Sequence, residues 1–373
     1  MIKRKRIFNL LLIISVSFLL ISCTNKNKLL LLNWGEYIND DLVKKFEKEN
    51  NVEVVISIAD SNELFYSKVK SGTTVYDLVI PSDYMIEKMH EKDLISKIDY
   101  SKLKNYDENL NPYMPGVINI LNNLNTDSNL YTIPYFWGTF GLMYNKNKEG
   151  LEKAIINYGW DAYFNRELLP NNTRIGMYNV SRYAYAAAMY YYHESANDYS
   201  KDLLNKAEKV LSNLNINEWG TDTLKKGIVA NNLDLAFLYT GDYLDMLYMD
   251  LEDKDINEIS YDIYIPDETI AFMDGFVIPK KSKNKDLAYK FIDFFLDPEN
   301  AYQNASVVGY ATPLVNSYNK IINYEGNDKW LNNWSYANKK YYPYDEIKGI
   351  PLKNFNKNIL DEINQMINNV KIN

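Results

Sequence analysis

Four short segments of this sequence each place an aromatic residue close to a carboxylate. They are Trp34-Gly35-Glu36-Tyr37, Ser82-Asp83-Tyr84, Tyr239 with Asp242, and Phe272 with Asp274. The faces of aromatic rings attract ammonium groups, and a carboxylate adds charge-assisted hydrogen bonds to the same group. Because none of the four segments contains Lys or Arg, the sequence favours a cationic ligand over an anionic one.

Each of these signals has a simpler explanation when it is taken alone. The chain contains 33 Tyr, so an aromatic residue beside an acid also occurs by chance. Asp83 could serve only as a helix cap, and helix N-termini near these loops would by themselves favour an anion. The prediction of a cation site therefore depends on whether the fold brings the four segments together.

The first hundred residues alternate between strand-like and helix-like patterns. The continuous apolar run at residues 29–32 is typical of a buried parallel strand, and residues 52–58 and 77–80 are also predicted to be strands. A capped helix is predicted after each of them, and residues 39–41, which begin with Asn39, supply the first cap. This order predicts a parallel sheet covered by helices. In such sheets, ligands bind outside the carboxyl ends of the strands, where residues 34–37 and 82–84 are expected.

Three further strands are predicted at residues 131–145, 233–239 and 276–279. The last two lie next to the two remaining aromatic–acid segments, Tyr239 with Asp242 and Phe272 with Asp274. Tyr239 ends the second of the three strands and Asp242 follows it in a turn. Phe272 and Asp274 lie just before the third. These positions predict that the two segments face the same region of the fold.

The N-terminus resembles a bacterial export signal. Residues 3–6 are all basic, residues 7–21 are mostly apolar, and Ser22-Cys23 follows. The apolar run is short for a membrane span, so we predict a lipoprotein signal peptide over residues 1–22, lipidation of Cys23 and a tether over residues 23–28. A permanent N-terminal membrane helix is the alternative. Cys23 is the only cysteine, which excludes an intrachain disulfide.

Charge and the scarcity of reactive residues exclude several functions. The net charge is −8, and loss of residues 1–22, with four basic and no acidic residues, would leave −12, a field that repels nucleic acid. His90 and His193 are the only histidines, and neither has a partner at metal-ligand spacing. We therefore predict no catalytic residue, metal, cofactor or nucleic-acid partner, and a monomer. A hydrolase using two carboxylates stays open.

Several stretches in this order resemble the spermidine/putrescine-binding proteins of bacterial ABC import transporters. Besides Asn33 to Tyr37, they are Tyr76 to Ser82, Ile133 to Gly138, Tyr239 to Asp242, Met273 to Gly275, and Gly309 to Pro313. The resemblance implies an α/β, two-lobed periplasmic-binding-protein fold, with a central, largely parallel sheet flanked by helices in each lobe and the ligand cleft between the lobes. It implies a first lobe of residues 29–140 plus 275–318 and a second of residues 141–274 plus 319–373.

The same resemblance implies which residues would touch the ligand, with Asp274 as the main amine-binding group. The first lobe would supply Trp34, Glu36, Tyr37, Ser82, Asp83 and Tyr84; Trp137 would lie near the crossover; the second lobe or hinge would supply Tyr239, Asp242, Phe272 and Asp274. Tyr239 stands where the family usually has Trp. In these proteins the aromatic rings line the methylene chain and the acids hold the terminal amines.

The resemblance implies capture of a polyamine, putrescine or spermidine or both, for delivery to an ABC permease. The protein would act in the periplasm or at the cell surface, anchored by lipid. Residues 179–183 lack the acids of some spermidine-preferring members, and Asp242 after Gly241 resembles putrescine-preferring members. A sugar, a peptide or another organic cation is the alternative ligand, because one fold hosts many ligands.

Overall fold

The first sheet of the protein is fully parallel, as predicted. The computed structural model describes residues 27–125 and 127–372, so the predicted signal peptide and Cys23 lie outside the described residues. Strand β1 (Asn27–Asn33) pairs in parallel with β2 (Val52–Ile58) on one side and β3 (Leu78–Val79) on the other. Because Asn27 already pairs with Val52, the tether predicted over residues 23–28 extends two residues too far.

Two helices connect these strands and a third follows β3, and their ends follow from local chemistry. They are α2 (Asp40–Asn50), α3 (Asn62–Ser71) and α4 (Asp83–Glu91). The Asn39 side chain accepts hydrogen bonds from the backbone N–H groups of Asp41 and Leu42, which starts α2. Leu42 and Phe46 are buried on one face of that helix, so its amphipathic pattern attaches it to the sheet.

The second sheet is mixed, which corrects the expectation of a largely parallel sheet. Its order is β6-β5-β7-β4-β8, with β9 paired to β4. The strands are β4 (Ile133–Asn145), β5 (Ile175–Tyr178), β6 (Glu218–Gly220), β7 (Leu235–Tyr239), β8 (Tyr261–Tyr264) and β9 (Ala271–Phe276). Strand β5 is parallel to β6 and β7, whereas β4 is antiparallel to β7, β8 and β9. The long strand β4 enters the sheet against the direction of its neighbours.

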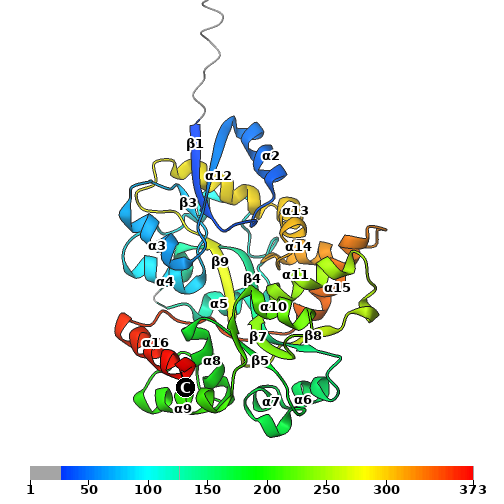
Figure 1. Ribbon diagram of the computed structural model, residues 1–373. Coiled ribbons are helices and arrows are strands. Elements are labelled where there is room, and N and C mark those ends of the chain that lie inside the picture. The colour runs from blue at the N-terminus through cyan, green and yellow to red at the C-terminus, as the bar shows by residue number, and fades with distance from the viewer. Residues whose placement is uncertain (1–26, 126, 373) are drawn as a thin grey trace, which may run out of the picture.

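Strands β4 and β9 run side by side through the middle of the molecule (Figure 1). Residues 133–139 of β4 pair with β9, and residues 140–144 pair with β7. Next to β9, Val277 bridges to Val79 of the first sheet. These two strands therefore connect the two sheets.

The strand predicted at residues 276–279 lies earlier, at residues 271–276. Asp274 and Gly275 interrupt the apolar pattern of residues 271–276, so the sequence pattern did not identify these residues as a strand. Its register with β4 sets Asp274 opposite Phe136 and Met273 opposite Trp137. Since neighbouring residues of a strand point to opposite faces, Asp274 and Trp137 face opposite sides of this ribbon.

The remaining helices pack around both sheets. They are α5 (Pro115–Asn123), α6 (Leu151–Tyr158), α7 (Trp160–Phe164), α8 (Ser181–Tyr191), α9 (Lys201–Asn213), α10 (Asp222–Val229), α11 (Thr240–Leu251), α12 (Lys285–Leu296), α13 (Pro298–Val308), α14 (Val315–Ile322), α15 (Lys329–Tyr341) and α16 (Lys357–Ile372). In the described part of the chain, no helix has the length and apolar character needed to cross a membrane.

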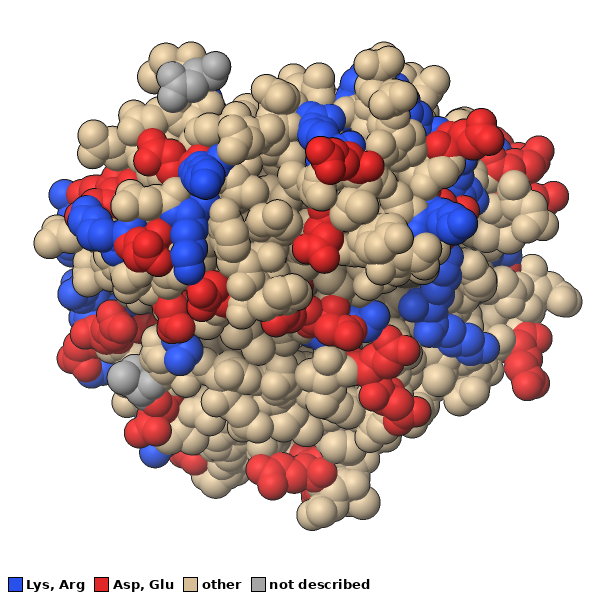
Figure 2. Space-filling model, turned by 90° about the horizontal axis from the view of Figure 1, so that it is seen from below, with Lys and Arg blue, Asp and Glu red and all other residues tan. Residues whose placement is uncertain are grey.

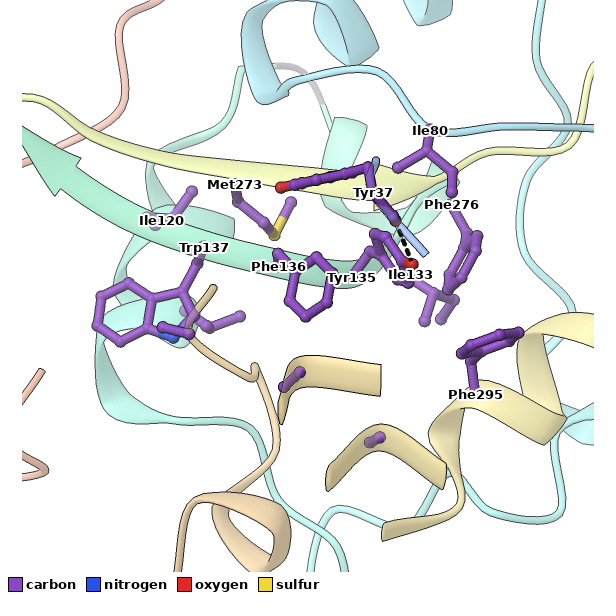
Figure 3. Packing of buried hydrophobic residues seen from close by; sticks show 14 of the residues in the cluster. Tyr37, Ile80, Ile120, Ile133, Tyr135, Phe136, Trp137, Met273, Phe276 and Phe295 are labelled. Carbon is purple, nitrogen blue, oxygen red and sulfur yellow. Dashed lines mark hydrogen bonds between the residues drawn. The ribbon is translucent and has the colours of Figure 1, made fainter. Parts of the chain in front are cut away.

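Two buried apolar clusters stabilise this arrangement. One extends from the first sheet along β4 and β9 to helices α11–α15, and the other lies between the second sheet and helices α6–α9 and α16. Figure 3 shows the first cluster around β4, where Tyr37, Phe136 and Met273 pack near one another and the Tyr135 hydroxyl donates to the Tyr37 carbonyl. Tyr37, which follows the first strand, is thereby fixed beside the connecting strands.

Candidate functional site

Asp274 on β9 is a buried carboxylate whose hydrogen-bond donors are neutral. Its Oδ1 accepts a hydrogen bond from the Ser82 hydroxyl at 2.6 Å, and its Oδ2 accepts one from the Tyr37 hydroxyl at 2.7 Å. Burial raises the pKa of Asp274 to about 6, although both hydroxyls lower it. Within residues 27–125 and 127–372, Asp274 forms no ion pair with Lys or Arg. A buried, unpaired carboxylate of this kind is a strong acceptor for a cation.

The start of α4 holds Asp274 in this position through several backbone contacts. Ser82 and Asp274 form an isolated antiparallel bridge, and Gly275 N–H donates to the Pro81 carbonyl at 3.0 Å. The Asn62 amide donates to the Ser82 hydroxyl at 3.0 Å, which leaves the hydroxyl hydrogen free to point at Asp274. The loop after β3 and the strand β9 are therefore joined at the carboxylate.

Asp83 reinforces the same junction from the first turn of α4. One oxygen accepts from the backbone N–H of Met273 at 3.0 Å, and the other accepts from that of Tyr84 at 2.6 Å. Burial raises the pKa of Asp83 well above its usual range. Asp83 is the first residue of α4 and not its cap, and its side chain fixes the residue next to Asp274.

Aromatic side chains gather beside Asp274 from the end of β7 and from β9. The Tyr239 and Phe272 rings meet edge to face with centroids 5.1 Å apart, and the Tyr239 and Tyr183 hydroxyls hydrogen-bond at 2.7 Å. Tyr183 in turn is close enough to Tyr84 to raise its pKa, after the larger effect of burial. Residues of β7, β9, α4 and α8 thus contribute to one aromatic wall.

Tyr310 links the two acidic parts of the site, and the sequence reasoning did not select it. It packs edge-on against Tyr37 with ring centroids 5.2 Å apart. It also lies so close to Gly241 that a Cβ there would come within 2.9 Å of its ring. Burial raises the pKa of Tyr310, and the charges of Asp242 and Asp274 raise it further. Tyr310 lies in residues 309–313, one of the stretches that resemble the family, and that resemblance is the feature of the sequence that could have identified it.

Asp242 in the first turn of α11 has a partner that the sequence did not reveal. Lys225 on α10 donates to its Oδ1 at 3.2 Å, while its Oδ2 is buried without a hydrogen-bond partner. Burial raises the pKa of Asp242 to about 6, against the lowering effect of Lys225. The four segments contain no Lys or Arg, but the folded site does contain a lysine, which comes from α10.

The match to known proteins covers most of the chain. Residues 41–336 match the family described as bacterial extracellular solute-binding protein. The chain belongs to this family. The spermidine/putrescine-binding periplasmic protein of Escherichia coli is 29% identical over 313 residues, covering 82% of this chain and 83% of that protein. The putrescine-binding periplasmic protein of Pseudomonas aeruginosa is 29% identical over 305 residues, covering 78% and 81%.

The solved structures give the same result for this solute-binding protein. The crystal structure of a spermidine/putrescine ABC transporter substrate-binding protein from Streptococcus pneumoniae has a TM-score of 0.73 and 28% identity. The alignment covers 93% of this chain and 99% of that one. The predicted family and its α/β two-domain periplasmic-binding-protein fold are thereby confirmed.

The structure brings most, but not all, of the predicted ligand residues of this solute-binding protein together. Trp34 packs on Phe65 with ring centroids 4.6 Å apart, and its buried indole N–H has no hydrogen-bond partner. Glu36 is exposed, in a turn with φ of 51°. No hydrogen bond or ion pair joins Glu36 to the described residues around Asp274, so its predicted role has no structural support.

Trp137 lies apart from the predicted site residues around Asp274. It is 4% exposed, lies on the face of the β4–β9 ribbon opposite Asp274, and donates its indole N–H to the Thr312 carbonyl at 3.1 Å. On that face it borders a separate pocket of about 170 Å³ together with Thr139 and Lys340. The strand alternation that buries Trp137 removes it from the acidic cluster.

The negative charge of the site comes from a few carboxylates near Asp274 and not from an acidic molecular surface. Figure 2 shows Asp and Glu interspersed with Lys and Arg on the face seen from below. The acidic character near Asp274 arises instead from buried carboxylates with few cationic neighbours. Such groups act strongly because little water screens them.

Proposed function

We propose that this solute-binding protein captures a polyamine, putrescine or spermidine or both, outside the cytoplasm and delivers it to the permease of an ABC importer. The observation that supports this most is the buried carboxylate of Asp274, whose only described hydrogen-bond donors are the hydroxyls of Ser82 and Tyr37. An ammonium group supplies the cation that this carboxylate lacks. The names of the similar proteins agree with this choice of ligand.

The surrounding aromatic residues suit the rest of such a ligand. The rings of Tyr239, Phe272 and Tyr310 offer apolar faces to a methylene chain and π-faces to its ammonium ends. The free oxygen of Asp242 would take a second ammonium group. The family binds solutes for transport, and we assign no catalytic role to any of these residues.

We further propose that the lobes close around the ligand by a hinge motion. Two of the three proposed lobe boundaries, between residues 140 and 141 and between residues 274 and 275, fall inside β4 and β9. The third, between residues 318 and 319, falls inside α14. Asp274 therefore lies at the hinge itself, where it already contacts Ser82 and Tyr37 of the proposed first lobe. A cation at Asp274 would strengthen the contact that closure requires.

A ligand panel measured by thermal unfolding tests this function. We expect putrescine or spermidine, at a hundred times its dissociation constant, to stabilise residues 24–373 by about 2.7 kcal/mol and to raise the melting temperature by several degrees. Sugars, peptides and anionic solutes are expected to cause no shift. The proposal fails if every polyamine leaves the melting temperature unchanged while a sugar or peptide raises it.

Anchoring through Cys23 is a separate proposal with its own test. We expect Cys23→Ser to release the protein from the membrane fraction or to block its maturation, because the two or three acyl chains of a lipoprotein hold it firmly. Fractionation of cells expressing either form, with immunoblotting, provides the measurement. Unchanged processing and membrane retention of the Cys23→Ser protein would instead indicate another anchor, such as a permanent N-terminal helix.

A further inference from the structure

Lys225 is a buried cation at the edge of the site, and the proposed function leaves it without a role. It lies on α10, and its side chain is 9% exposed. Its Nζ lies 3.2 Å from Asp242 Oδ1 and 2.8 Å from Asp245 Oδ2. Burying an ammonium group is costly, so a buried lysine directed at a predicted ligand-binding carboxylate requires an explanation.

Lys225 leaves one of the two oxygens of Asp242 unused. The side chain of Asp242 is 15% exposed, and its Oδ2 is buried with no hydrogen-bond partner. The charge of Asp242 acts on both Tyr178 and Tyr310, so its carboxylate lies beside the aromatic residues of the site. Asp242 Oδ1 is therefore paired with the ammonium group of Lys225, and Oδ2 can accept a hydrogen bond from one further donor.

The carboxylates near Asp242 would attract a third ammonium group only weakly. Asp245 is 56% exposed and already bonds Lys225, and Asp222 is exposed at the start of α10, so solvent screens both carboxylates. The segment of residues 179–183 supplies Arg182 and no acid. Asp242 would then be shared between Lys225 and one terminal ammonium group, so a third ammonium group extending past Asp242 would approach Lys225 with only the exposed carboxylates of Asp245 and Asp222 nearby.

We propose that Lys225 determines ligand charge: it positions Asp242 to receive one terminal ammonium group and repels a third, so the site selects a diamine over a triamine. This inference rests on the proposed function. It assigns Lys225 as a positioning residue for Asp242 and as the specificity determinant of the site. The selected ligand class is an alkyl diamine with one ammonium at Asp274 and the other at Asp242 Oδ2.

The test compares putrescine and spermidine by isothermal calorimetry at pH 8 in wild type and Lys225→Met. We expect wild type to bind putrescine more tightly than spermidine. In Lys225→Met, the ratio of the two affinities is expected to shift towards spermidine at least fivefold, because the repelling charge is gone. Lys226→Met is the matched control, since Lys226 is exposed and forms no ion pair in the described part of the chain; it should leave the ratio unchanged.

The outcomes separate this inference from the function on which it rests. If wild type binds both amines and the ratio in Lys225→Met equals that of wild type, Lys225 is not the determinant, and polyamine binding itself stands. If wild type binds neither amine, the function is wrong and the inference with it. Should Lys225→Met not fold, Lys225→Gln, which keeps a donor for Asp242 without the charge, undergoes the same comparison.

Discussion

Asp274→Asn is expected to lower the affinity for putrescine at least thirtyfold. The asparagine keeps the shape of the side chain but removes its charge. Its amide nitrogen can only donate, so one of the two hydroxyls of Ser82 and Tyr37 must accept a hydrogen bond where it now donates one. Losing a charge-assisted bond to a buried ammonium typically costs about 2–5 kcal/mol, or roughly thirtyfold or more in affinity. Isothermal calorimetry of the two proteins at pH 8 gives the comparison directly.

The same substitution is expected to make the free protein more stable at pH 8. The folded-state pKa of Asp274, about 6, lies above its value in an unfolded chain, near 3.9. Stability from this group is therefore complete below about pH 4 and is lost as the pH rises through 6. The difference of about two units corresponds to roughly 3 kcal/mol at most, and Asn cannot ionise. A rise in melting temperature of a few degrees is expected.

Asp267→Asn is the matched control for both measurements. The Asp267 side chain is 95% exposed, so its substitution should change neither the affinity nor the melting temperature noticeably. Binding by Asp274→Asn that equals wild type would remove Asp274 from its central role. A lower melting temperature of the free variant would show that the ionised carboxylate stabilises the fold rather than straining it.

Acidic pH is expected to weaken polyamine binding by about tenfold to a hundredfold between pH 8 and pH 5. Both Asp274 and Asp242 have pKa values of about 6 in the free protein, whereas alkyl ammonium groups stay charged throughout this range. Below pH 6 the ligand must displace a proton from each carboxylate, so the affinity falls as the pH falls. Calorimetry across this range, in buffers of differing ionisation enthalpy, also counts the released protons.

The variant Asp274→Asn separates the two carboxylates in this profile. With Asp274 removed, the remaining dependence on pH belongs to Asp242 and should be about half as steep. An affinity that stays constant from pH 8 to pH 5 in wild type would contradict the assignment of buried carboxylates as the ammonium acceptors. A profile that weakens only above pH 8 would indicate deprotonation of the ligand instead.

Local sequence patterns predicted the parts of this protein whose structure depends on near neighbours. The strand predicted at residues 52–58 is β2, and the alternating order of the first strands and helices correctly predicted a parallel sheet. Asn39 capped α2 where the sequence placed a cap. Such features follow from side-chain periodicity and capping, which act over a few residues.

The sequence was less informative where polar residues interrupt a strand. The pairing of β9 with β4 at Asp274 and Gly275 was misplaced because its pattern is not apolar. This error affected the site, since strand alternation decides that Asp274 faces Ser82 while Trp137 faces Thr312. Register is fixed by the partner strand, and that partner lies more than 130 residues away in the sequence.

By itself, the sequence determined that carboxylates and aromatic rings follow the predicted strands, and that none of the four segments carries a cation. Only the tertiary structure decided which of them share one site. It joined Asp274 to Tyr37 across 237 positions, added Tyr310, and directed Lys225 at Asp242. These contacts depend on the packing of β9 against the first sheet and of α10 against α11, which no short stretch of residues specifies.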